Sequence, residues 1–180
     1  MGRDRSALEE VSSLAFEADV SNPHSIQNAV LAAGQEVEQI DWWVYAAGDI
    51  PASPLAEMKP EDWNRILNAN LTGVYLTAHY SLPLLSRDAA MYVLGAVSER
   101  MRLPGLGAYA AAKAGLEALG EVMRKELRRP VVIVRPKAVQ TGLWEKVPFK
   151  APPGAMKPED LATRMLDAYQ TGYKEPNLDL

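Results

Sequence analysis

Short apolar segments that alternate with helical stretches constrain the fold of this 180-residue chain more than any other feature. Residues 42–45, 91–94 and 131–134 are apolar throughout, which is typical of strands buried on both faces of a parallel sheet. Residues 14–20 alternate apolar and polar side chains and predict a further strand. Strands that alternate with helices in this way predict an α/β fold with a mostly parallel sheet and right-handed crossovers.

The predicted helices have recognisable starts. Asn22 suits a cap and Pro23 a first turn, so a helix is expected to begin there and to end before Asp41. The pentapeptide Met-Lys-Pro-Glu-Asp occurs at 58–62 and at 156–160, where it puts a proline and two acids at a helix start. We interpret it as reused helix-start chemistry within a single domain, residues 1–180, because nothing beyond it matches.

Composition excludes several classes of function. A net charge of -4 and a pI near 5.3, with no basic stripe, predict no nucleic-acid binding. Without cysteine there is no disulfide or Cys-ligated metal, and His24 and His79 lack ligand spacing, so no metal site is predicted. The absence of a signal peptide and of a long apolar run predicts a cytoplasmic protein with no membrane contact.

Tyr109 and Lys113 are the first candidate catalytic residues. They lie four residues apart at the start of a helix predicted over about 107–128, so they share one helix face. An ammonium group about 4 Å from a phenol should lower its pKa, ordinarily about 10, by close to three units. Such a phenol could exchange protons near neutral pH. The same spacing also occurs on helices without any catalytic role.

The order of these segments and their motifs resembles the short-chain dehydrogenase/reductase family over nearly the whole chain. Tyr109 and Lys113 resemble its Tyr-x-x-x-Lys, and Asn70, followed by Leu-Thr-Gly, resembles its catalytic Asn. Ala47 and Gly48 keep the end of its Asn-Asn-Ala-Gly motif.

Two further motifs extend the resemblance. Asp19 and Val20 resemble the pair that flanks the adenine ring of the cofactor. Pro136 and Thr141 resemble the family's Pro-Gly-x-Val-x-Thr, with Lys137 in place of its glycine. The resemblance implies a Rossmann-like doubly wound fold, a small carbonyl or alcohol substrate, and a nicotinamide cofactor that carries the hydride.

The resemblance also implies roles for single residues. Tyr109 would be the proton donor or acceptor at the substrate oxygen, and Lys113 would lower its pKa and bind the nicotinamide ribose. Asn70 would hold a water molecule that relays protons to Lys113. Thr141 and the backbone after Pro136 would hold the nicotinamide. Two structural alternatives stay open: Asn70 could cap or kink its helix, and Thr141 could simply start a loop.

The chain departs from the family at its catalytic serine. The family's serine lies thirteen residues before the tyrosine, and that position here is Ala96. Ser98, eleven residues before Tyr109, is the nearby hydroxyl that could take the same oxyanion-stabilising role. Otherwise, substrate polarisation would rest on Tyr109 alone.

A second departure concerns the N-terminus. The family's first strand and Gly-rich turn, which hold the pyrophosphate, have no counterpart, so about thirty residues look truncated. Arg3 resembles the arginine that binds the 2′-phosphate, and therefore favours NADP over NAD. The apolar strand at 42–45 would then lie at an edge, which we expect residues 14–20 or another chain to cover. Trp42 and Trp43 are predicted to be core or interface packing.

Two hypotheses follow. The first is an NADP-dependent oxidoreductase whose residues 143–155 form a substrate lid. The second is a non-catalytic remnant, an oligomerising scaffold with weak or no cofactor binding. A homodimer or homotetramer is expected because the two longest helices carry more apolar residues than one sheet contact requires. Examples are Leu76, Tyr80, Leu84, Leu116, Leu119 and Met123.

Overall fold

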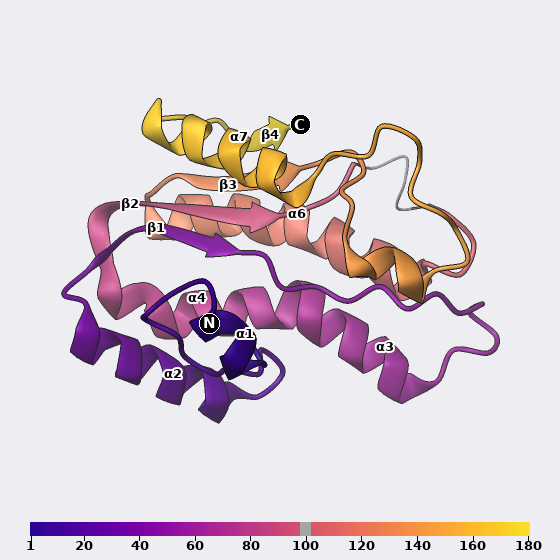
Figure 1. Ribbon diagram of the computed structural model, residues 1–180, viewed down its shortest axis with the longest axis horizontal. Helices are drawn as coiled ribbons and strands as arrows, with labels where there is room; N and C mark the ends of the chain where they lie inside the picture. The colour runs from indigo at the N-terminus through magenta and orange to yellow at the C-terminus, as the bar shows by residue number, and fades with distance from the viewer. Residues whose placement is uncertain (98–101) are drawn as a thin grey trace.

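The computed structural model describes residues 1–97 and 102–180 (Figure 1). The elements, in chain order, are α1 (Arg5–Glu9), α2 (Pro23–Glu36), β1 (Ile40–Tyr45), α3 (Pro60–Leu67), α4 (Gly73–Ser81), β2 (Leu85–Leu94), α6 (Gly107–Leu127), β3 (Val131–Arg135), α7 (Pro158–Gln170) and β4 (Asn177–Asp179). A π-helical turn at Asn68–Thr72 joins α3 to α4, and 3₁₀ turns occur at Leu82–Leu84 and Gly142–Lys146.

The strands form one parallel sheet in the order β1-β2-β3-β4. Core residues of α4 and α6 pack on one face of the sheet, and α7 packs on the other. Helix α2 packs on α4 at the end of the molecule opposite α7 (Figure 1). Helices on both faces of a parallel sheet make this a Rossmann-like α/β fold, as predicted.

Burial on both faces explains the continuous apolar runs of β2 and β3, whereas β1 is not buried on both faces as predicted, since its Val44 is 40% exposed. In β2, Met91 and Val93 face the core shared with α4 and α6, whereas Ala90 and Tyr92 face α7. Each of these side chains is at most 8% exposed. Because successive residues of a strand point to opposite faces, a strand covered on both sides has no position for a polar residue.

The predicted helix starts are confirmed. The side chain of Asn22 accepts hydrogen bonds from the backbone N–H groups of His24 and Ser25, and Pro23 opens α2. Helices α3 and α7 begin at Pro60 and Pro158, inside the two copies of the repeated pentapeptide.

The strand predicted over residues 14–20 is wrong. This stretch pairs at a single position, Glu17 with Gly2, where the Ala18 N–H donates to the Gly2 carbonyl oxygen at 2.8 Å. A strand needs a partner along its length, and the short N-terminal segment offers one residue. Part of the stretch is buried nonetheless, since Ala18 is 4% exposed and Val20 packs against the core, whereas Leu14 is 44% exposed.

Strand β1 lies at the edge of the sheet, and β2 is its strand neighbour. The expectation that residues 14–20 would cover this edge is therefore wrong, because they do not extend along it as a strand. Cover by another chain stays a prediction. Trp43 is buried in the core, and Trp42 stacks on Tyr169 with ring centroids 4.9 Å apart, so both tryptophans pack within the fold as expected.

The helix that begins at Pro60 is interrupted by the π-helical turn at Asn68–Thr72, whose buried residue is Asn70. Such turns insert an extra residue into a helix and are frequent at functional sites. Asn70 was expected either to cap or to kink its helix if it had only a structural role. Its place in a π-helical turn favours the kink over the cap.

Candidate active site

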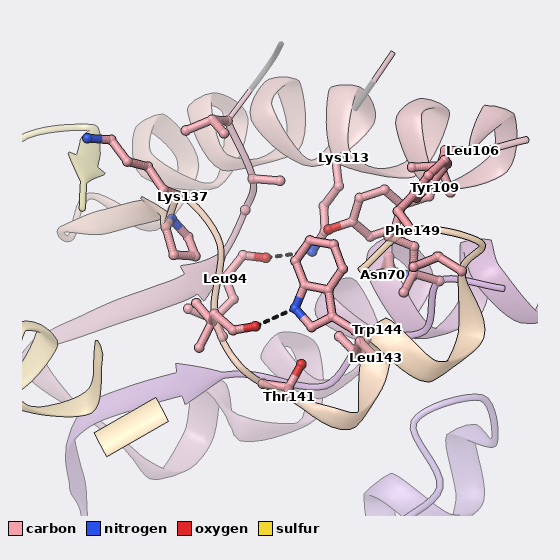
Figure 2. A pocket seen from close by; sticks show the side chains of 18 of the residues that line it. Asn70, Leu94, Leu106, Tyr109, Lys113, Lys137, Thr141, Leu143, Trp144 and Phe149 are labelled. Atoms are coloured by element: carbon pink, nitrogen blue, oxygen red, sulfur yellow. Dashed lines mark hydrogen bonds between the residues drawn. The ribbon is translucent and has the colours of Figure 1, made fainter. Parts of the chain in front are cut away.

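One cavity of about 490 Å³ lies at the carboxyl ends of β1, β2 and β3 (Figure 2). The carboxyl ends of parallel strands meet at one edge of the sheet, which is where open α/β folds bind ligands. The first turns of α6 and the loop after β3 complete the cavity. Its lining includes these predicted site residues: Ala47, Gly48, Asn70, Tyr109, Lys113, Pro136 and Thr141.

Tyr109 and Lys113 face this cavity from α6. The Lys113 Nζ atom lies 5.5 Å from the centroid of the Tyr109 ring and donates a hydrogen bond of 2.6 Å to the Leu94 carbonyl oxygen. Figure 2 shows the Tyr109 hydroxyl directed toward the end of the Lys113 side chain. The helix thus places both side chains on one face, and β2 supplies the carbonyl that orients the amine.

The predicted lowering of the phenol pKa is not what this geometry produces. Burial raises the pKa of Tyr109 to about 12, because the phenolate would lose its hydration. Burial also lowers the pKa of Lys113 to about 8, against a smaller opposing effect of Glu117. Desolvation therefore exceeds the attraction between the two groups, and each favours its neutral form more than in water.

Asn70 is 1% exposed, and its side-chain orientation is well defined. Its Nδ2 atom donates to the carbonyl oxygens of Asp49 at 2.7 Å and Ile66 at 2.9 Å. Its Oδ1 atom is buried and has no partner among the described residues. A Cβ atom at Gly48 would lie 3.0 Å from this oxygen, so a glycine keeps the space beside it open. A buried acceptor of this kind is expected to bind a donor.

Residues of the predicted lid form the remaining wall. Leu143, Trp144, Val147 and Phe149 line the cavity with apolar surface. The Trp144 indole N–H donates to the Val139 carbonyl oxygen at 2.6 Å, which fixes the ring across the cavity (Figure 2). The wall therefore presents apolar and aromatic surface opposite the polar side chains of Tyr109 and Asn70.

The structure does not bring every predicted residue to the cavity. Arg3, Asp19 and Val20 are outside its lining as far as the described residues define it. Asp19 accepts hydrogen bonds from the backbone N–H and the hydroxyl of Ser21, which lower its pKa, and the nearby Arg3 guanidinium adds to this effect. Ala96 lines the cavity, and Ser98 lies outside the described residues.

Two residues beside the cavity were missed from the sequence. Tyr45 donates a hydrogen bond of 2.7 Å from its hydroxyl to the Ala69 carbonyl oxygen, next to Asn70. Asp49 pairs with a lid lysine 97 residues away. Tyr45 stands at the first Asn position of the family motif, which could have drawn attention to it. No local pattern could have indicated the contact of Asp49.

Two general features bear on the kind of site. Within the part of the chain that the structure describes, no cluster of three His, Cys, Asp or Glu side chains could hold a metal ion. None of the described helices combines the length and apolarity that a bilayer crossing requires.

Comparison with known proteins defines the class. The model of a family described as enoyl-(acyl carrier protein) reductase matches residues 3–168. The chain is also 30% identical over 165 residues to a 3-oxoacyl-[acyl-carrier-protein] reductase of Thermotoga maritima, covering 84% of this chain and 67% of that protein. The chain therefore belongs to the short-chain dehydrogenase/reductase family.

Solved structures agree on the fold. A putative short-chain oxidoreductase from Thermus thermophilus is 30% identical with a TM-score of 0.81, covering 93% of this chain and 81% of that one. An alcohol dehydrogenase from Thermococcus sibiricus, complexed with 5-hydroxy-NADP, is 22% identical with a TM-score of 0.89, covering 99% of this chain and 83% of that one. The chain spans 56% of a Synechocystis 3-oxoacyl-[acyl-carrier-protein] reductase and 61% of an uncharacterised Schizosaccharomyces pombe oxidoreductase.

Proposed function

We propose that this protein is an oxidoreductase that uses NADP, in preference to NAD, to interconvert a small carbonyl compound and its alcohol. The observation that carries the proposal is the meeting of Tyr109, Lys113 and Asn70 at one largely apolar cavity. A cavity of about 490 Å³ has the size of typical small-molecule sites. Family membership supports the class of reaction.

The residues present fit the nicotinamide end of the cofactor. Gly48, Pro136 and Thr141 border the cavity beside Lys113, and the unpaired Asn70 oxygen offers an acceptor in the same wall. The bound nicotinamide would supply hydride chemistry. Lys113 would hold its ribose, and Asn70 would hold a water molecule between itself and Lys113.

Tyr109 would transfer the proton at the substrate oxygen. With a pKa of about 12, its phenol stays protonated at neutral pH. It can therefore donate a hydrogen bond and then a proton to a carbonyl oxygen without prior activation. This state suits reduction of a carbonyl, whereas oxidation of an alcohol would first require loss of the phenol proton.

The preference for NADP rests on Arg3, which lies near Asp19 and is exposed to solvent. An exposed guanidinium can bind the 2′-phosphate that distinguishes NADP from NAD. Substitution of Arg3 by Gln should therefore weaken binding of NADPH more than that of NADH.

A second candidate function is a scaffold that binds the dinucleotide weakly. The adenosine end finds less support than the nicotinamide end, because Arg3, Asp19 and Val20 do not line the described cavity.

Titration with NADPH distinguishes the two candidates. Binding is measured by nucleotide fluorescence and by the melting temperature of the protein. Saturable micromolar binding is expected for the oxidoreductase, and the absence of a response at millimolar NADPH would contradict it.

Turnover provides the second arm of this test, with NADPH consumption followed over a panel of aldehydes and ketones. Tyr109→Phe should lower turnover by roughly 10²- to 10⁴-fold, because it removes the proton donor. The variant should keep the NADPH affinity of the wild type. Equal turnover in the variant and the wild type would exclude Tyr109 as the acid.

A further inference from the structure

A buried carboxylate beside the cavity has no role in the proposed chemistry. Asp49 follows β1 and is 8% exposed. One carboxylate oxygen accepts a hydrogen bond from Lys146 Nζ at 2.6 Å, and the other accepts from Arg65 Nη1 at 2.9 Å. Two cations on one buried carboxylate satisfy it with charge-assisted bonds, which are stronger than neutral ones.

The lysine partner belongs to the lid. Lys146 ends the 3₁₀ turn Gly142–Lys146, which also carries Trp144 into the cavity. A backbone bond strengthens the same junction, because the Ala52 N–H donates to the Lys146 carbonyl oxygen at 3.1 Å. The lid is therefore tied to the segment after β1 by one ion pair and one backbone hydrogen bond.

The main chain of the same aspartate holds a residue of the candidate site. The Asp49 carbonyl oxygen accepts the hydrogen bond of 2.7 Å from Asn70 Nδ2. The second bond of this amide, to Ile66, stays within its own helix, so Asp49 supplies the link between Asn70 and the rest of the site. A shift of Asp49 would therefore change where the unpaired Asn70 oxygen points.

We propose that Asp49 is a positioning residue that couples closure of the lid to the placement of the Asn70 side chain. When the lid is docked, the ion pair with Lys146 fixes the position of the Asp49 carboxylate. The Asp49 carbonyl oxygen, in turn, fixes the orientation of the Asn70 side chain through its hydrogen bond to Nδ2. Arg65 holds the second oxygen, so the carboxylate stays paired when the lid leaves. An effect of this coupling on catalysis rests on the proposed function, whereas the link between the lid and the Asn70 side chain does not.

Substitution of Lys146 by Met tests the ion pair, because it removes the ammonium group and keeps an unbranched side chain. Lys146 is 43% exposed, so the fold should tolerate the change. Hydrogen exchange of the Ala52 amide, measured by NMR, is expected to become about threefold to tenfold faster, because lid docking protects this amide. The neighbouring Ser53 amide is an internal reference, since it donates to Gly105 at 2.9 Å and should keep its rate.

The side-chain amide signals of Asn70 report the coupling. They should shift in Lys146→Met and in Asp49→Asn, and they should stay unchanged in Glu145→Gln, which alters an exposed charge on the same turn. Unchanged Ala52 exchange in Lys146→Met would overturn the ion-pair tie. Faster exchange with unmoved Asn70 signals would overturn the coupling. These measurements need no cofactor, so they remain decisive even if the protein proves not to reduce carbonyls.

Discussion

At the scale of single residues, the site depends on an amine that the fold keeps away from water. Lys113 is 5% exposed and has one hydrogen-bond acceptor, Leu94, among the described residues. Burying an ammonium group is unfavourable, and the lowered pKa of about 8 expresses this. The pair with Tyr109 was predictable from spacing, but the dominance of burial over charge attraction depends on atoms from the rest of the chain.

The stability of the protein should therefore depend on pH through Lys113. Its pKa falls from 10.5 in the unfolded chain to about 8 in the folded one. Between these values the unfolded state binds more protons, so the free energy of unfolding rises with pH across this window. Compared with Lys113→Met, the wild type should gain roughly 1–3 kcal/mol between neutral pH and pH about 10.

Urea denaturation at several pH values measures this gain. Lys125→Met is a matched control, because Lys125 lies on the same helix and is exposed. Its stability difference from the wild type should stay constant across the window. A constant difference for Lys113→Met as well would show that the amine is not desolvated.

At the scale of elements, the π-helical turn decides where Asn70 points. Tyr45 on β1 contacts this turn, because its hydroxyl donates to the Ala69 carbonyl oxygen. Gly73 makes room for this hydroxyl, since a Cβ atom there would collide with it.

Tyr45→Phe should destabilise the protein by about 1–2 kcal/mol, because it removes the partner of a buried carbonyl oxygen. Tyr92→Phe is the matched control on the neighbouring strand. Its hydroxyl donates to Tyr173 over 3.3 Å, against 2.7 Å for Tyr45, so its loss should cost less. Free energies from urea denaturation compare the two variants, and an equal cost would argue against a special role for the Tyr45 bond.

At the scale of the whole molecule, the expected homodimer or homotetramer remains a prediction. Leu116 and Met123, which suggested an interface from the sequence, lie in the core of this chain. Tyr75 on α4 and Val122 on α6 remain exposed, at 52% and 46%. The π-helical turn at Asn68–Thr72, which leads into α4, packs on α6 through Leu71, and a Cβ atom at Gly115 would approach Leu71 to 3.0 Å.

Val122→Glu should therefore reduce self-association, because it places a charge in the expected interface. The molar mass from light scattering during gel filtration should fall towards that of a single chain. Leu166→Glu, at a residue of α7 that is 41% exposed, should leave the mass of the wild type unchanged. A wild-type mass of one chain would contradict the expected oligomer.

Local patterns were enough to predict the class of fold, and motifs that resemble those of the family indicated much of the candidate site. Apolar runs, helix caps and the spacing of Tyr109 and Lys113 are properties of neighbouring residues, and neighbouring residues determine the strands, helix starts and helix faces. Strand pairing, the pKa of a buried group and contacts between distant residues were decided by the tertiary structure alone. Residues 14–20 lack a strand partner, burial sets the pKa of Tyr109, and Asp49 meets Lys146 from a point 97 residues away. Desolvation and long-range pairing arise only when the chain is folded, so no local pattern contains them.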